Sequence, residues 1–171
     1  MKILLKSIII FFLTLSTLVS CQKLNQLTTV SNVDLTKYSG VWYSIASYPQ
    51  FFERGSSNVR ATYTAKENYI EVYNQSTKDG EPNDIKGKAY VVENSGNAKL
   101  KVQFFWPFRG NYWIIDLASD YTWAVVSDPK MKTLWILSRT PKMDNTLYDN
   151  ILTSLIKRGF DQQRIVKMVQ Q

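Results

Sequence analysis

The chain has 171 residues, of which 44% are hydrophobic and 13% aromatic, and this is enough for one domain with a sizeable core. Its formal net charge is +7, but the basic residues are scattered, so a solvated surface is favoured over a nucleic-acid-binding arm. The lack of histidine and the single cysteine exclude His-based acid–base catalysis, Cys/His dyads, internal disulfides and zinc sites built on His or Cys. We therefore expect no metal and no cofactor.

The first twenty residues are typical of a secretory signal. Lys2 and Lys6 form a positive n-region, and the mostly apolar stretch from Ser7 to Val19 is too short to span a bilayer comfortably. Removal of residues 1–20 takes both lysines away, so the mature chain carries +5 and is only moderately basic. This charge is compatible with attraction to anionic lipid headgroups.

The signal ends in Leu18-Val19-Ser20-Cys21, which resembles the lipobox of bacterial lipoproteins. The resemblance implies that Cys21 becomes the mature N-terminus, is thioether-linked to diacylglycerol and is then N-acylated with a chain such as palmitate. Two or three acyl chains anchor a protein stably, whereas one chain holds it only reversibly. An ordinary secretory signal followed by a chance cysteine is the alternative. Gln22 in place of Asp favours the outer membrane if the source is Gram-negative.

Residues 22–32 are largely polar and contain no aromatic side chain, so we interpret residues 21–32 as a lipidated cysteine with a short tether. One folded domain, 33–171, follows. Its first strand is expected from Gly40 to Ser47, where Trp42, Ser44 and Ala46 share one face. A long loop, 48–57, comes next.

Seven more short strands are expected at hairpin spacing, at 58–65, 69–75, 85–93, 99–106, 111–117, 122–127 and 134–138. Turn residues separate them, as at Lys78–Pro82, Asn94–Asn97 and Asp128–Lys130. Eight such strands are typical of an all-β, antiparallel up-and-down barrel. An interior of this size holds side chains alone or one small ligand.

The hydrophobic period changes after Pro141, where one apolar stripe indicates a helix formed by Leu147, Tyr148, Ile151, Leu152, Leu155 and Ile156. Asp144 is the expected N-cap and Gly159 the expected residue after the C-cap. The stripe fits a helix packed on the outside of the barrel or, alternatively, one lying on a membrane surface. We expect a last short strand at Ile165–Val169, beside the first strand.

Three short motifs stand in order along this pattern. Gly40 and Trp42 open the first strand, Ser119-Asp120-Tyr121 precedes the seventh, and Arg139 ends the eighth, where the face of a buried tryptophan is a suitable partner for its guanidinium. These residues match the motifs of the lipocalins, and segments such as YSGVWYSIA and LWILSRTP resemble the bacterial outer-membrane lipoprotein branch of that family. The resemblance covers about Val33 to Gln171.

The resemblance implies an eight-stranded lipocalin barrel with one C-terminal helix outside, a helical turn at Val33–Tyr38 over the floor, and structural roles for Gly40, Trp42, Asp120, Tyr121 and Arg139. It also implies a lipid-binding, non-enzymatic protein that stores or transports fatty acids, lysophospholipids or similar molecules. The protein would be anchored through Cys21 in the outer membrane, facing the periplasm, with a homodimer as one possibility.

The side chains expected to bind the ligand follow from strand sidedness. Trp42 inward gives Ser44 and Ala46 inward. The resemblance to the lipocalins implies that Arg139 also points inward, which gives Leu137 and Trp135 inward. The predicted ligand-binding residues are Ala46, Ala61, Tyr63, Val72, Val102, Phe104, Tyr112 and Trp135, with Arg109 and Lys86 near strand ends where they would meet a carboxylate or phosphate headgroup. The alternatives are that some of these point outward, that side chains fill the barrel, or that the two cations are ordinary surface groups.

Phe105, Trp106 and Phe108 flank Pro107 and form an aromatic cluster on a loop. This cluster would guide a lipid inward, touch the membrane, pack the barrel end or form a dimer contact. Two other functional classes stay open. A carboxylate such as Glu71 or Asp116 inside an apolar cup would suit a lipocalin-fold enzyme acting on a lipophilic substrate, and a nucleic-acid-binding barrel would suit the aromatic residues and charge but not an export signal.

Overall fold

The computed structural model describes residues 27–51 and 53–171. The signal segment, Cys21, the tether up to residue 26 and Phe52 lie outside these residues, so the predictions made for them stay predictions. In the part of the chain that is described, none of the helices has the length and apolar character needed to cross a membrane.

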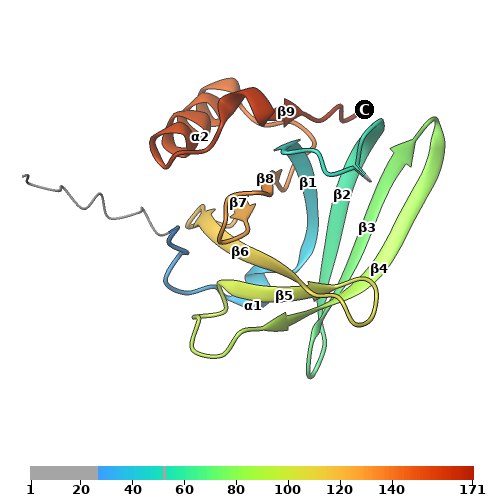
Figure 1. The fold of residues 1–171 in the computed structure, drawn as a ribbon, viewed down its shortest axis with the longest axis vertical. Coiled ribbons are helices and arrows are strands. Elements are labelled where there is room, and N and C mark those ends of the chain that lie inside the picture. Colours follow the sequence, from blue (N-terminus) through green and yellow to red (C-terminus); the bar gives the residue numbers. More distant parts are fainter. Residues whose placement is uncertain (1–26, 52) are drawn as a thin grey trace, which may run out of the picture.

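The predicted eight-stranded antiparallel barrel with one helix outside is confirmed (Figure 1). Each strand pairs with the next along the chain, and β1 pairs with both β2 and β8, which closes the sheet. Closure removes most of the unpaired edges, although residues 81–87 of β4 pair with β3 and not with β5. The eight strands are β1 (Gly40–Ser47), β2 (Ser56–Ala65), β3 (Ile70–Lys78), β4 (Glu81–Val91), β5 (Lys99–Gln103), β6 (Gly110–Leu117), β7 (Trp123–Ser127) and β8 (Leu134–Ser138).

The strand boundaries around two loops differ from the sequence prediction for local reasons. The turn expected over Lys78–Pro82 is only two residues long, because Asp79 (φ 53°) and Gly80 (φ 87°) form a hairpin turn with positive φ at both positions. Therefore β3 and β4 both extend further than predicted. In contrast, β5 ends at Gln103 instead of Trp106, and the backbone N–H of Phe108 donates to the carbonyl of Phe105 to form a turn.

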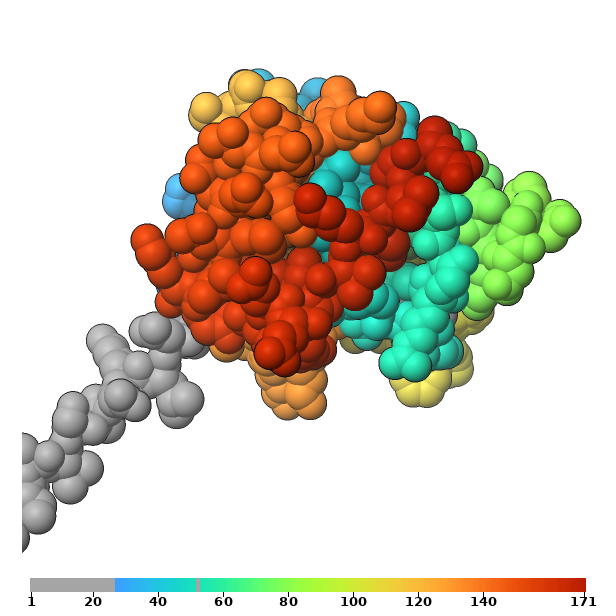
Figure 2. Space-filling model, turned by 90° about the horizontal axis from the view of Figure 1, so that it is seen from above, coloured from blue at the N-terminus to red at the C-terminus, as the bar shows by residue number. Residues whose placement is uncertain are grey.

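The apolar side chains form two layers, one on each side of the sheet. The inner cluster fills the lower part of the barrel around Trp42, Leu100 and Ile114. The outer cluster lies between the barrel and α2 (Asn145–Lys157), and it includes Ile136 and Leu155. Figure 2 shows this C-terminal part, orange to red, covering much of the visible face. Alternation along the strands therefore serves two cores, which explains why strands such as β7 are buried on both faces.

The stripe on α2 packs on the outside of the barrel, with Tyr148, Ile151 and Leu155 buried. The Asp144 side chain caps the helix by accepting a hydrogen bond from the backbone N–H of Leu147. As expected from the sequence, the chain also ends in a short strand, β9 (Val166–Lys167), that pairs with β1.

The segment before the barrel is packed over part of the length assigned to the tether. Leu27 is buried in the outer cluster, and the backbone N–H of Val30 donates to the carbonyl of Ile114 at 3.0 Å. The helical turn predicted near residues 33–38 is α1 (Leu35–Tyr38), capped by the Asp34 carboxylate. The last residues of the predicted tether therefore pack against the barrel, where the side chain of Leu27 is buried.

Candidate functional site

One end of the barrel is closed by a cluster centred on Arg139. Its guanidinium lies 3.8 Å above the ring centroid of Trp42, and its N–H groups donate to the carbonyls of Lys37, Val41 and Tyr121. The Trp42 indole N–H donates to the Tyr38 carbonyl at 2.8 Å. A planar fork on an aromatic face is the arrangement that arginine supports and lysine does not.

The other motif residues hold the same end in shape. Gly40 has φ +100°, and a Cβ at this position would lie 3.3 Å from Nη1 of Arg139, so both backbone and space favour glycine. The Asp120 carboxylate accepts from the N–H and hydroxyl of Thr122, and the Tyr121 hydroxyl accepts from the backbone N–H of Asp34. These contacts connect the loop before β7 to α1.

Above this floor the barrel contains a cavity of about 510 Å³ with a largely apolar wall. The barrel is therefore not filled by its own side chains. The wall contains all but two of the predicted ligand-binding residues, namely Ala61, Tyr63, Val72, Val102, Phe104, Tyr112, Trp135 and Arg109. Volume and composition fall in the range of sites that hold small organic ligands, which runs from about 300 to 1,000 Å³.

Ala46 is one of the two exceptions, and a β-bulge explains it. Opposite β8, Ser44 faces Leu137 while Ala46 faces Ile136, so β1 contains an extra residue between these pairs. The extra residue reverses the sidedness of the strand. Ser44 and Leu137 therefore line the cavity as expected, whereas Ala46 lies in the outer cluster, and its placement inside the barrel was wrong.

Lys86 is the second exception. Its neighbour Gly87 lies opposite Val72, which faces the cavity, so Lys86 projects from the outer face. Its ammonium group lies 5.1 Å from the centroid of the Tyr73 ring. The prediction that Lys86 lies at the mouth was wrong, since position near a strand end does not determine the face.

Three tyrosines form a hydrogen-bonded network in the deep part of the barrel. The hydroxyl of Tyr63 donates to that of Tyr112 at 2.9 Å, and the hydroxyls of Tyr112 and Tyr38 are 2.8 Å apart. Burial raises the pKa of Tyr63 to about 12 and raises those of Tyr38 and Tyr112 well above the ordinary value. The network is therefore neutral at physiological pH, and its hydroxyls are satisfied by one another.

Two polar atoms in the cavity wall have no hydrogen-bond partner among the described residues. They are Ser44 Oγ, on a side chain that is 2% exposed, and Asn74 Oδ1. Both atoms are buried within the wall, so the cavity does not expose them. Buried hydrogen-bonding groups without partners are unfavourable, and these two atoms therefore lower the stability of the wall.

The open end carries aromatic groups, and Phe105 and Phe108 line the mouth. Arg60 and Arg109 border it, but their guanidinium groups lie toward the outer face, where Arg60 donates to the Gln75 side chain and Arg109 lies over the Tyr90 ring. The first loop also reaches this end, because the Glu53 carboxylate accepts from the indole N–H of Trp135 at 2.9 Å. The mouth therefore has an apolar rim with basic residues behind it, which suits an amphipathic ligand.

Neither carboxylate considered for catalysis faces the cavity. Glu71 lines a groove on the outer face, and Asp116 forms an ion pair with Arg158 at 3.0 Å at the end of α2. Among the described residues, the cavity wall contains no Asp or Glu. The wall thus offers no carboxylate acid or base to a bound molecule.

Sequence reasoning missed several residues of the site. Val59 lines the cavity on the same face of β2 as Ala61 and Tyr63, so the strand period predicts its inward position. Asn74 follows Val72 at the strand period, a signal that predicts its inward position. Glu53 lies in a loop, where no periodic pattern exists to predict its contact with Trp135.

Comparison with known proteins agrees with this geometry. A family profile described as a lipocalin-like domain matches residues 33–170. An outer membrane lipoprotein Blc from Vibrio cholerae is 40% identical over 146 residues, which cover 83% of this chain and 85% of that protein. A protein of the same name from Escherichia coli K12 is 38% identical over 142 residues, covering 81% and 80% of the two chains.

The fold also has relatives among solved structures. Insecticyanin from the tobacco hornworm Manduca sexta superimposes with a TM-score of 0.67 over 83% of each chain, at 21% identity. At this identity the likeness concerns the fold alone.

Proposed function

The chain belongs to the lipocalin family, and we propose that it stores or transports one amphipathic molecule, such as a fatty acid or a lysophospholipid, inside its barrel. Members of this family generally bind or transport small molecules. The single observation that carries the proposal is the open apolar cavity above a sealed floor. Each methylene that leaves water on entering it contributes about 0.8 kcal/mol, part of which is lost to ordering of the chain.

The two ends of the cavity give the ligand an orientation. An acyl chain fits the apolar lower part, and its polar headgroup lies at the open end, where Arg109 borders the wall. The absence of a carboxylate from the described wall supports binding over the alternative, a lipocalin-fold enzyme acting on a lipophilic substrate.

The protein would act at a membrane. The V. cholerae and E. coli relatives are named outer membrane lipoproteins, and the lipobox at Cys21 supplies the corresponding anchor on this chain. We propose that Cys21 is lipidated and holds the barrel at the outer membrane, facing the periplasm. Replacement of Cys21 by Ser should move the protein from the membrane fraction to the periplasmic fraction. Retention of the variant in the membrane would contradict the anchor and leave the cavity proposal untouched.

The first test of the ligand is native mass spectrometry of residues 22–171, purified without detergent, with organic extraction of any bound molecule. All described secondary structure lies within this chain. We expect close to one lipid per barrel. An empty protein that also fails to bind added fatty acid and lysophospholipid would refute the carrier function.

A matched pair of variants locates the binding site. Ala61 lines the cavity, while its neighbour Thr62 points to the outer face of the same strand. Ala61→Phe should fill the cavity and lower the amount of bound lipid at least about tenfold, since the acyl chain of the lipid then has less apolar surface to bury against. Thr62→Phe adds the same ring outside and should bind normally. Equal binding by both variants, with unchanged circular dichroism, would show that the lipid lies elsewhere.

A further inference from the structure

The loop between β5 and β6 exposes three large aromatic side chains. Phe105 is 69% exposed, Trp106 87% and Phe108 77%. We call residues 104–109 the aromatic loop. Exposed aromatic residues clustered in this way are unfavourable in water and mark an interaction surface. Phe105 and Phe108 also line the cavity mouth, so a partner held by this loop lies beside the opening.

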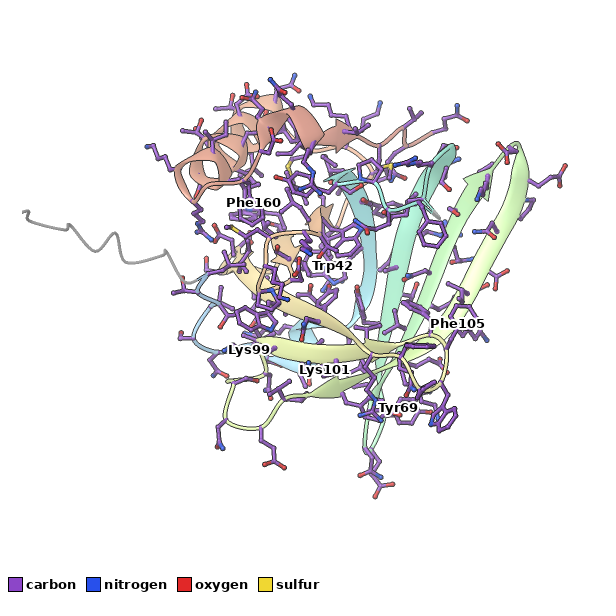
Figure 3. All side chains as sticks on the ribbon, viewed as in Figure 1. Trp42, Tyr69, Lys99, Lys101, Phe105 and Phe160 are labelled. Atoms are coloured by element: carbon purple, nitrogen blue, oxygen red, sulfur yellow. The ribbon has the colours of Figure 1, made fainter. Side chains whose placement is uncertain are left out.

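A basic face adjoins the aromatic loop on the outside of the barrel. A groove there is lined by Trp106, Lys86, Lys88, Arg109 and Glu71, so three cations meet one carboxylate. Lys99 and Lys101 continue the positive charge along β5, and Figure 3 shows them on the strand that leads to the loop carrying Phe105. We call these five cations the basic face.

Four of the five cations of the basic face lie over aromatic rings. The ammonium groups of Lys88 and Lys99 lie 4.7 and 4.4 Å from the ring centroids of Tyr69 and Trp113, and the guanidinium of Arg109 lies 4.5 Å from that of Tyr90. The lysine and arginine side chains pack on these rings and keep their charged groups at the surface. Tyrosine and tryptophan side chains favour the boundary between water and lipid. The face thus combines positive charge with interfacial aromatics.

We propose that the aromatic loop and the basic face dock the barrel on a bilayer that contains anionic phospholipid, with the cavity mouth beside the lipid. Apolar insertion and electrostatic attraction add in such binding. A second copy of the chain is disfavoured as the occupant, since a symmetric contact would bring two faces of like charge together. The proposal goes beyond ligand binding and does not depend on it.

The test uses residues 22–171, which lack Cys21, so that any membrane binding comes from the folded protein. Sedimentation is measured with vesicles of phosphatidylcholine alone and of phosphatidylcholine mixed equally with phosphatidylglycerol. We expect binding to the anionic vesicles that weakens as salt is raised. Trp106→Ser should weaken it about tenfold. Trp106 does not line the cavity, so this variant should retain lipid in native mass spectrometry.

A charge-matched pair separates the basic face from net charge. Lys86→Gln with Lys88→Gln should weaken vesicle binding at least about fivefold. Lys142→Gln with Lys157→Gln removes the same charge at other exposed positions and should leave binding unchanged. Equal losses from both pairs would overturn the proposal, because charge alone would then explain binding.

Three further outcomes would overturn it as well. They are equal affinity for neutral and anionic vesicles, a dimer that Trp106→Ser dissociates, and a single-stranded oligonucleotide that displaces the vesicles through the same residues. Retention of lipid by a protein that ignores vesicles would refute docking while leaving the proposed function intact.

Discussion

Replacement of Arg139 by Met should destabilise the barrel by removing the contact that closes its floor. The side chain makes three hydrogen bonds to carbonyls and lies 3.8 Å above the Trp42 ring. A hydrogen bond from a charged donor contributes about 1.5–3 kcal/mol net, and the cation–π contact about 0.5–2 kcal/mol. Because the side chain is half-buried and these contributions are not additive, we expect a loss of about 3–5 kcal/mol in the free energy of unfolding.

Thermal unfolding followed by circular dichroism measures this loss. At about 2–4 °C per kcal/mol for a domain of this size, the Tm of Arg139→Met should fall by roughly 6–20 °C. Arg139→Lys keeps the charge but not the three-way fork, and should lose more than half as much. Arg164 provides the control. It is exposed, its guanidinium lies 4.2 Å from the centroid of the Tyr48 ring, and its side chain donates one hydrogen bond to a carbonyl. A Tm for Arg139→Met no lower than that of Arg164→Met would refute the reasoning.

Three smaller predictions concern single features. Gly40→Ala should lower the free energy of unfolding by about 1–3 kcal/mol because of the positive φ at this position. The loss should exceed that of Gly80→Ala, whose added Cβ meets nothing within 4 Å. Similar losses in Tm for the two variants would show that the added methyl group is not crowded by Arg139. Asp144→Ala should cost about 0.5–2 kcal/mol in urea unfolding, while Asp144→Asn keeps the cap and should be nearly neutral. Because the pKa of Tyr63 is about 12 in the folded chain and 10 in the unfolded chain, stability should be intact below pH 10 and fall by about 2–3 kcal/mol as pH approaches 12, and Tyr63→Phe should flatten this decline in alkaline unfolding.

The sequence alone was sufficient for most of the fold and much of the wall. Alternation of polar and apolar residues follows from strand geometry, so Trp42 correctly indicated Ser44, and Arg139 correctly indicated Trp135 and Leu137. The helix stripe and its cap at Asp144 were equally local signals. Features that have a local physical cause can therefore be predicted from a single sequence.

The errors came from features that depend on the neighbouring strand. The bulge that moves Ala46 out of the cavity exists only in the register between β1 and β8. The period of a single strand cannot reveal such a bulge, because the bulge becomes visible only when the register of the partner strand is known.

The two ends of the barrel differ in how their side chains are satisfied. At the closed end the Arg139 guanidinium and the Tyr63 and Tyr112 hydroxyls form hydrogen bonds within the protein. At the open end large aromatic side chains such as Phe105 and Trp106 are exposed to solvent. Since folding normally buries apolar groups, those that stay exposed are the ones that favour a partner from outside. The hydrogen-bonded floor fixes the shape of the barrel, and the exposed rim is the end at which we expect a ligand or a membrane to be met.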